Sequence, residues 1–119
     1  MIRMKTKYSI LIIIVLFLIG CEKDGVPKGT PDCIERTIEG IKDDPIWNPP
    51  AKVFSYLYKG KVVYYIPQRC CDIPSILMDG ECNIICSPDG GISGTGDGKC
   101  PDFFTSRSNE KLIWEDLRM

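Results

Sequence analysis

Cysteines are the residues of this chain whose number and spacing point most directly to chemistry. Of the seven, one follows an apolar N-terminal segment, and the other six are Cys33, Cys70, Cys71, Cys82, Cys86 and Cys100. An even number in a small exported chain is typical of a disulfide framework, here of three bridges whose connectivity the sequence leaves open. Because neighbouring side chains of an extended segment point to opposite faces, we expect Cys70 and Cys71 to join different partners. A bridge between these two neighbours is the alternative, and it needs strained geometry.

Zinc binding and thiol redox chemistry are the other uses of clustered cysteines. Cys82 and Cys86 have three residues between them, as in one knuckle of a zinc site, but a second such pair is missing. The Cys-x-x-Cys motif of redox proteins does not occur. We therefore favour structural disulfides over both alternatives.

The first twenty residues predict export. Three basic residues precede an apolar run of 13 residues from Tyr8 to Gly20, which is the pattern of a secretory signal. Such a run covers only about 20 Å of a hydrocarbon core roughly 30 Å thick, so a permanent membrane helix is the weaker interpretation. Leu18-Ile19-Gly20-Cys21 resembles the lipobox of bacterial lipoproteins. That resemblance implies cleavage before Cys21, acylation of its thiol, and an anchor in the cell envelope. The outer membrane is the expected location, and the outer side of the inner membrane is the alternative. An ordinary signal peptide with an incidental cysteine is the alternative.

Removal of residues 1–20 makes the chain more acidic. Lys plus Arg falls from 15 to 12 while Asp plus Glu stays at 16, so the remaining 99 residues carry a net charge of −4. This balance argues against a nucleic-acid partner and against electrostatic attraction to anionic lipid. The size fits one domain with a modest core.

Histidine is absent from the chain, which excludes Ser-His-Asp and Cys-His catalysis and every His-ligated metal site. Paired carboxylates act on glycans in some enzymes, and Asp79, Glu81, Asp97 and Asp102 are candidates by charge alone. A domain this small has little room for a deep cleft. We therefore expect no enzymatic activity and no catalytic residue, with a minor hydrolase as the alternative.

Residues 87–102 are rich in glycine, with five glycines and two prolines. A phosphate-binding loop is excluded, because Ser93 stands where its first glycine is needed and Cys100 follows Lys99. Calcium is the better-matched cation: Asp89, Asp97 and Asp102 could supply hard oxygen ligands. The favoured interpretation is that Asp-Gly pairs make turns. We therefore expect no cofactor, with calcium as an open alternative.

The expected fold class is α+β, with one N-terminal helix packed on a small antiparallel sheet. Residues 21–29 are expected to be a lipidated N-terminus and flexible tether, before a single domain at 30–119. Thr30 as N-cap, Pro31 and Asp32 predict a helix start. The helix carries an apolar stripe and ends at Asp43-Asp44-Pro45. The stripe consists of Ile34, Ile38 and Ile41. Cys33 should tie the helix to the rest of the domain.

A hairpin over residues 52–67, with Lys59-Gly60 as its turn, is the clearest sheet element. Alternation puts two sets of side chains on opposite faces: Phe54, Tyr56, Tyr58, Val63 and Tyr65, against Val53, Ser55, Leu57, Val62, Tyr64 and Ile66. We expect both faces to be core, an exposed aromatic platform being the alternative. Trp47 lies in a predicted loop, and we expect its side chain to be buried in the core. Residues 71–80 are expected to be a loop with a short turn, and a last strand is expected near 111–115.

Several segments together resemble a family of small cysteine-rich bacterial lipoproteins that carry a domain of unknown function. They are Cys70-Cys71-Asp72, the Cys82–Cys86 spacing, Pro88-Asp89-Gly90-Gly91-Ile92, the Gly-Asp-Gly-x-Cys-Pro-Asp-Phe segment that ends at Phe103, and Ile113-Trp114-Glu115-Asp116. The likeness extends over residues 33–116. It implies envelope location and disulfides, and it transfers no catalytic residue.

These observations favour a membrane-anchored, non-enzymatic binding or structural module. Its partner would be an envelope protein, a glycan or another envelope component, contacted through the glycine-rich loop 87–102 and nearby aromatic residues. The alternatives are a calcium-stabilised structural lipoprotein and a small protease-inhibitor-like module. In the latter, Lys99 and Arg107 would be the exposed residues offered to a protease.

Overall fold

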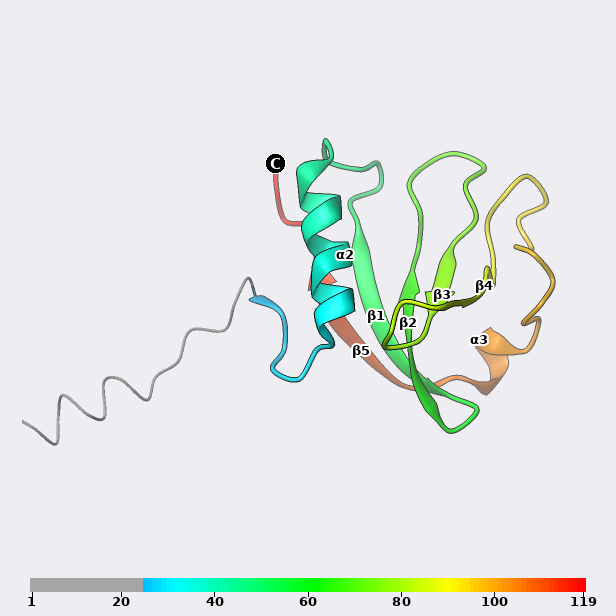
Figure 1. The fold of residues 1–119 in the computed structure, drawn as a ribbon. Helices are drawn as coiled ribbons and strands as arrows, with labels where there is room; N and C mark the ends of the chain where they lie inside the picture. The colour runs from blue at the N-terminus through cyan, green and yellow to red at the C-terminus, as the bar shows by residue number, and fades with distance from the viewer. Residues whose placement is uncertain (1–24) are drawn as a thin grey trace, which may run out of the picture.

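The computed structural model describes residues 25–119, so the predicted signal segment and Cys21 lie outside the described residues. The fold is α+β, as predicted: an antiparallel sheet in the order β4-β3-β2-β1-β5, with α2 against one face (Figure 1). The elements in chain order are α2 (Asp32–Asp43), β1 (Lys52–Tyr58), β2 (Lys61–Ile66), β3 (Ile76–Met78), β4 (Ile84–Cys86), α3 (Phe103–Ser106) and β5 (Ser108–Glu115). Among the described residues, no helix is long and apolar enough to cross a membrane.

Helix α2 forms where the sequence predicts it, but it begins differently. Its predicted apolar stripe is buried, and Ile34 and Ile38 have no exposed surface. The N-cap residue is Pro31, which makes no side-chain cap bond, so the prediction of Thr30 is wrong by one residue. The Thr30 hydroxyl instead donates to the carbonyl of Pro27 at 2.7 Å. The hydroxyl is therefore used to close the turn before the helix.

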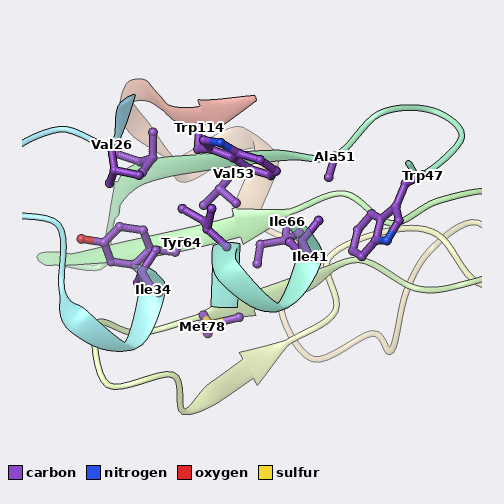
Figure 2. Packing of buried hydrophobic residues seen from close by; sticks show 12 residues of the cluster. Val26, Ile34, Ile41, Trp47, Ala51, Val53, Tyr64, Ile66, Met78 and Trp114 are labelled. Carbon is purple, nitrogen blue, oxygen red and sulfur yellow. The ribbon is translucent and has the colours of Figure 1, made fainter. Parts of the chain in front are cut away.

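The packed domain also begins earlier than predicted. Val26 is only 6% exposed and belongs to the core between α2 and the sheet. Val26, which lies in the segment predicted to be a tether, is thus packed against the domain. Figure 2 shows Val26 at one end of this cluster and Trp47 at the other. Trp47 is buried, so its predicted burial in the core is confirmed.

The hairpin of β1 and β2 has the predicted register. Phe54 pairs with Tyr65 and Tyr56 with Val63, which separates the two predicted sets of side chains. One set packs under α2 with Trp114, as Figure 2 shows for Val53, Tyr64 and Ile66. The other set forms a second cluster with Leu77, Cys86, Cys100 and Phe103. Both faces are core, as expected, and the alternative of an exposed aromatic platform is wrong.

Two short strands were not predicted: β3 lies within the segment predicted to be a loop, and β4 follows that segment. β3 pairs with β2, which places Leu77 opposite Tyr65 and buries it completely, and β4 pairs with β3. The predicted last strand is present as β5 and pairs with β1, but it starts at Ser108. β5 and β4 are consequently the two edges of the sheet.

The six predicted disulfide cysteines pair as Cys33 with Cys82, Cys86 with Cys100, and Cys70 with Cys71. Cys33 thus ties α2 to the segment before β4, as expected. The expectation that Cys70 and Cys71 have different partners is wrong. It assumed an extended backbone, whereas these residues lie in an exposed turn, where the N–H of Cys70 donates to the carbonyl of Asn48.

Candidate functional site

The candidate site is the glycine-rich loop, residues 87–102, together with Phe104 and Arg107 just after it. The loop leaves the edge strand β4, and it lies beyond the sheet face opposite α2 (Figure 1, yellow to orange). The disulfide between Cys86 and Cys100 closes it, with the two Cα atoms 6.2 Å apart. Both cysteines are buried in the cluster on this face, so the ends of the loop are fixed to the core.

The loop has two limbs, the first containing Ser87 and Gly90 and the second containing Gly96 and Asp97. Backbone hydrogen bonds join these limbs to each other. The N–H of Gly96 donates to the carbonyl of Gly90 at 3.0 Å, and that of Asp97 to the carbonyl of Ser87 at 2.9 Å. Gly90 also forms bridges with Pro74 and Thr95. A segment without a core of its own is therefore ordered by backbone bonds.

Two glycines allow the loop to pass close to other backbone, Gly96 within the loop and Gly90 beside the segment before β3. Gly96 has a φ of +69°, and a Cβ atom there would lie 1.9 Å from the carbonyl oxygen of Ser87. Gly90 has a φ of +78°, and its Cβ would lie 2.9 Å from the carbonyl oxygen of Ile73. A side chain at either position would collide with backbone and require a conformation that L-residues rarely adopt. The glycines thus hold the loop in one shape.

The Asp97 side chain stabilises the second limb of the loop through hydrogen bonds. Its carboxylate accepts hydrogen bonds from the backbone N–H of Lys99 at 3.0 Å and from that of Ser87 at 3.1 Å. The Lys99 bond, and then that from Ser87, hold the pKa of Asp97 below its usual range. Asp97 therefore acts as a turn-forming side chain, which is the favoured interpretation of its Asp-Gly pair.

Two tyrosines of the sheet hold the loop and the residue before α3 through their hydroxyl groups. Tyr65 donates to Asp89 at 2.8 Å, and Tyr58 donates to Asp102 at 2.7 Å. Burial, followed by the bond to Asp89, raises the pKa of Tyr65. The bond from Tyr58 lowers the pKa of Asp102. Ser75 adds a third link, since its N–H donates to the carbonyl of Asp89.

The predicted calcium ligands are not brought together. Asp89 and Asp102 accept bonds from different tyrosines, and Asp97 is bound to backbone groups within the loop. Within the part of the chain that the structure describes, no group of three or more acidic or cysteine side chains could hold a metal ion. The observed bonds fit turn-forming and loop-anchoring aspartates.

Asp79, one of the carboxylates considered for glycan hydrolysis, is likewise engaged in local structure. Asp79 accepts hydrogen bonds from the backbone N–H groups of Glu81 and Asn83 and from the Asn83 side chain. These bonds, the first being that of the Asn83 backbone, lower the pKa of Asp79. Asp79 thus shapes the turn between β3 and β4, and Glu81 is an exposed residue of that turn.

The loop presents one large apolar side chain to solvent. Ile92 is 93% exposed, and the hydroxyls of the adjacent Ser93 and Thr95 are hydrogen-bonded to each other at 2.9 Å. Ile92 was not predicted as a site residue, although an isoleucine between Gly91 and Ser93 in a glycine-rich stretch has few neighbours to cover it. Phe104 in α3, 40% exposed, was also missed.

Arg107 is not the free, exposed residue that the inhibitor interpretation requires. Its guanidinium lies 4.7 Å from the ring centre of Tyr56 and 4.8 Å from that of Phe104. It also donates to the hydroxyl of Tyr56 at 3.1 Å. The cation is thus stacked between aromatic rings. Lys99 is exposed, as expected.

A comparison with protein families places these features in one domain. The model of a domain of unknown function, DUF6970, matches residues 39–116. The chain belongs to the DUF6970 family. The DUF6970 region includes all five strands, the glycine-rich loop and α3, and it begins within α2. No curated protein and no solved structure matches the chain.

Proposed function

We propose that this DUF6970 protein is a lipid-anchored protein of the cell envelope whose domain binds a partner protein through loop 87–102. The proposal depends on one observation above all. Ile92 is 93% exposed on a loop whose backbone is fixed by a disulfide, by backbone hydrogen bonds and by two tyrosine–carboxylate bonds. A rigid loop loses little conformational entropy on binding, which raises affinity for a given contact area.

A protein partner fits this surface better than a glycan. The guanidinium of Arg107 lies over the ring of Phe104, at 4.8 Å from the ring centre, so it occupies a face on which a sugar ring could otherwise stack. Ile92 is aliphatic, and a branched apolar side chain at a loop tip suits an apolar pocket on another protein. Phe104 and the stacked Arg107 would border that contact.

The position of the loop agrees with a lipid anchor at the predicted Cys21. The described chain starts at Gly25, which lines one groove with Lys42 of α2 and with the end of β5. The loop lies on the far side of the sheet (Figure 1). An anchor at that end would leave the loop directed away from the lipid. The domain would then act as a spacer that holds the loop towards the periplasm or the cell exterior.

The test is site-specific cross-linking in cells that produce the full chain. A photo-reactive amino acid replaces Ile92, and in a matched variant it replaces Ile84, which is 69% exposed on the edge strand β4. We expect one discrete protein adduct from position 92 and none of that size from position 84. Mass spectrometry of the adduct names the partner.

Two further variants connect the adduct to the loop and the anchor. Gly96→Ala should abolish the adduct from position 92, because the loop loses its shape. Cys21→Ala should remove lipid from the mature chain, as measured by mass spectrometry. The binding proposal fails if position 92 gives no protein adduct, or if position 84 gives the same one. The anchor proposal fails separately if the native mature chain carries no lipid.

A further inference from the structure

A second surface, at the edge of the sheet far from loop 87–102, is formed by Gly25 and the end of β5. A groove of about 660 Å³ is lined there by Gly25, Lys42, Leu112, Trp114, Leu117 and Arg118, among others. β5 pairs with β1 on one side and is an edge of the sheet on the other. We call this surface the β5 groove.

Two leucines of the β5 groove are exposed on backbone that is held in place. Leu112 is 46% exposed and Leu117 is 79% exposed. Leu117 lies between Asp116 and Arg118, whose side chains form an ion pair with 2.7 Å between Nη2 and Oδ2. Arg118 also donates to the carbonyl oxygens of Lys42 and Asp44 at the end of α2. The exposure of Leu117 is therefore a feature of a docked segment.

The β5 groove is close along the chain to the proposed lipid anchor, which favours a membrane as the surface that covers it. Gly25 lines the groove and is four residues after Cys21. Four residues span at most about 14 Å when fully extended. If Cys21 carries lipid, the β5 groove is therefore held close to the head groups of that membrane, whereas loop 87–102 lies on the far side of the sheet (Figure 1).

We infer that the β5 groove is a membrane-docking surface, which rests against phospholipid and places Leu112 and Leu117 in the interfacial region. This inference rests on the proposed lipid anchor. The groove's charged side chains are two basic and two acidic, namely Lys42, Arg118, Glu115 and Asp116. Such a balance gives no attraction to anionic lipid, so contact depends on apolar burial and is insensitive to salt.

The two tryptophans of the chain allow a direct test. Trp114 lines the β5 groove, whereas Trp47 lies at the opposite end of the core from Val26 (Figure 2). Trp47→Phe leaves Trp114 as the reporter, and Trp114→Phe leaves Trp47. The mature protein, purified from cells that produce the whole chain, is placed in phosphatidylcholine vesicles with brominated acyl chains, which quench tryptophan fluorescence at short range.

We expect bromine to quench Trp114 at least about twofold more than Trp47, and high salt to leave that ratio unchanged. Leu117→Glu should remove most of the quenching of Trp114, while Ile84→Glu on the opposite sheet edge should not change it. If Trp47→Phe or Trp114→Phe does not fold, the same two glutamate variants are compared in the chain with both tryptophans.

Flotation of the vesicles separates the two proposals. Protein that floats but shows equal, weak quenching of both tryptophans overturns membrane docking and leaves the anchor standing. Protein that does not float overturns the anchor and the docking with it. If Leu117→Glu turns a dimer into a monomer in sedimentation and leaves the quenching unchanged, a second copy of the chain covers the groove, and docking on lipid is wrong.

Discussion

The two faces of the sheet are held together in different ways. Beneath α2, isoleucines, Val53 and two tryptophans are packed as hydrocarbon and aromatic surface. On the other face, Tyr58 and Tyr65 bond to carboxylates of Asp102 and Asp89, and a disulfide closes the loop. Apolar packing stabilises without fixing direction, whereas hydrogen bonds and glycine conformations specify one geometry. The comparison suggests that the α2 face supplies stability and the loop face supplies a shaped surface.

Ile38→Ala should produce the largest loss of stability. Ile38 has no exposed surface in the core under α2, and truncation of such a side chain costs about 2–5 kcal/mol. Urea unfolding measures the loss. Because no loop bond is removed, cross-linking from position 92 should persist wherever the variant is folded. Ile84→Ala, at an exposed isoleucine, should cost about 0.5 kcal/mol or less. Equal losses at both positions would contradict the assignment of the core.

Gly96→Ala and Gly98→Ala form a matched pair on the loop face. Both glycines have positive φ, +69° and +74°, but only at position 96 would Cβ collide with the backbone of Ser87. Gly98→Ala should cost about 1–2 kcal/mol for its backbone conformation alone. Gly96→Ala should cost more, about 3 kcal/mol, because the limbs must separate. Urea unfolding compares them, and an equal loss would show that the limbs do not touch in solution.

A smaller loss of stability is expected in alkaline solution. Burial and the bond to Glu110 raise the pKa of Tyr56 from 10.0 to about 12. Because the pKa of Tyr56 is higher in the folded state, Tyr56 contributes its full stabilisation below the pKa of the unfolded state, near pH 10. That contribution is lost as the pH rises towards about 12. The urea concentration at the midpoint of unfolding should therefore decrease as the pH rises from about 10 to about 12. Tyr56→Phe should reduce that fall, and an undiminished fall would assign it to other groups.

Periodicity predicted the long elements of this fold and failed for the short ones. The stripe of α2 and the alternation in β1 and β2 extend over enough residues to indicate faces and register. β3 and β4 have three residues each, too few for alternation to be seen between Pro74 and Asp79 or beside Cys86. β3 forms by pairing with β2, and β4 forms by pairing with β3, so both depend on the folded sheet.

The candidate site was predicted as a segment but not as a set of side chains. The even cysteine count and the glycine-rich composition identified loop 87–102. They did not identify Ile92 or Phe104, because the exposure of a side chain depends on what folds over it. The pairing of Cys70 with Cys71 was missed because the backbone there turns instead of extending. Aspartates that suggested calcium are instead bonded to tyrosines and backbone groups.

The central claim is that loop 87–102 holds one preformed shape before any partner binds. Amide hydrogen exchange of the folded protein tests this directly at Gly96 and Asp97, whose N–H groups donate to the carbonyls of Gly90 and Ser87. We predict that both amides are protected to a degree similar to those of the paired strands. Exchange of both at the rate of an unstructured chain, with the α2 core still protected, would contradict the account.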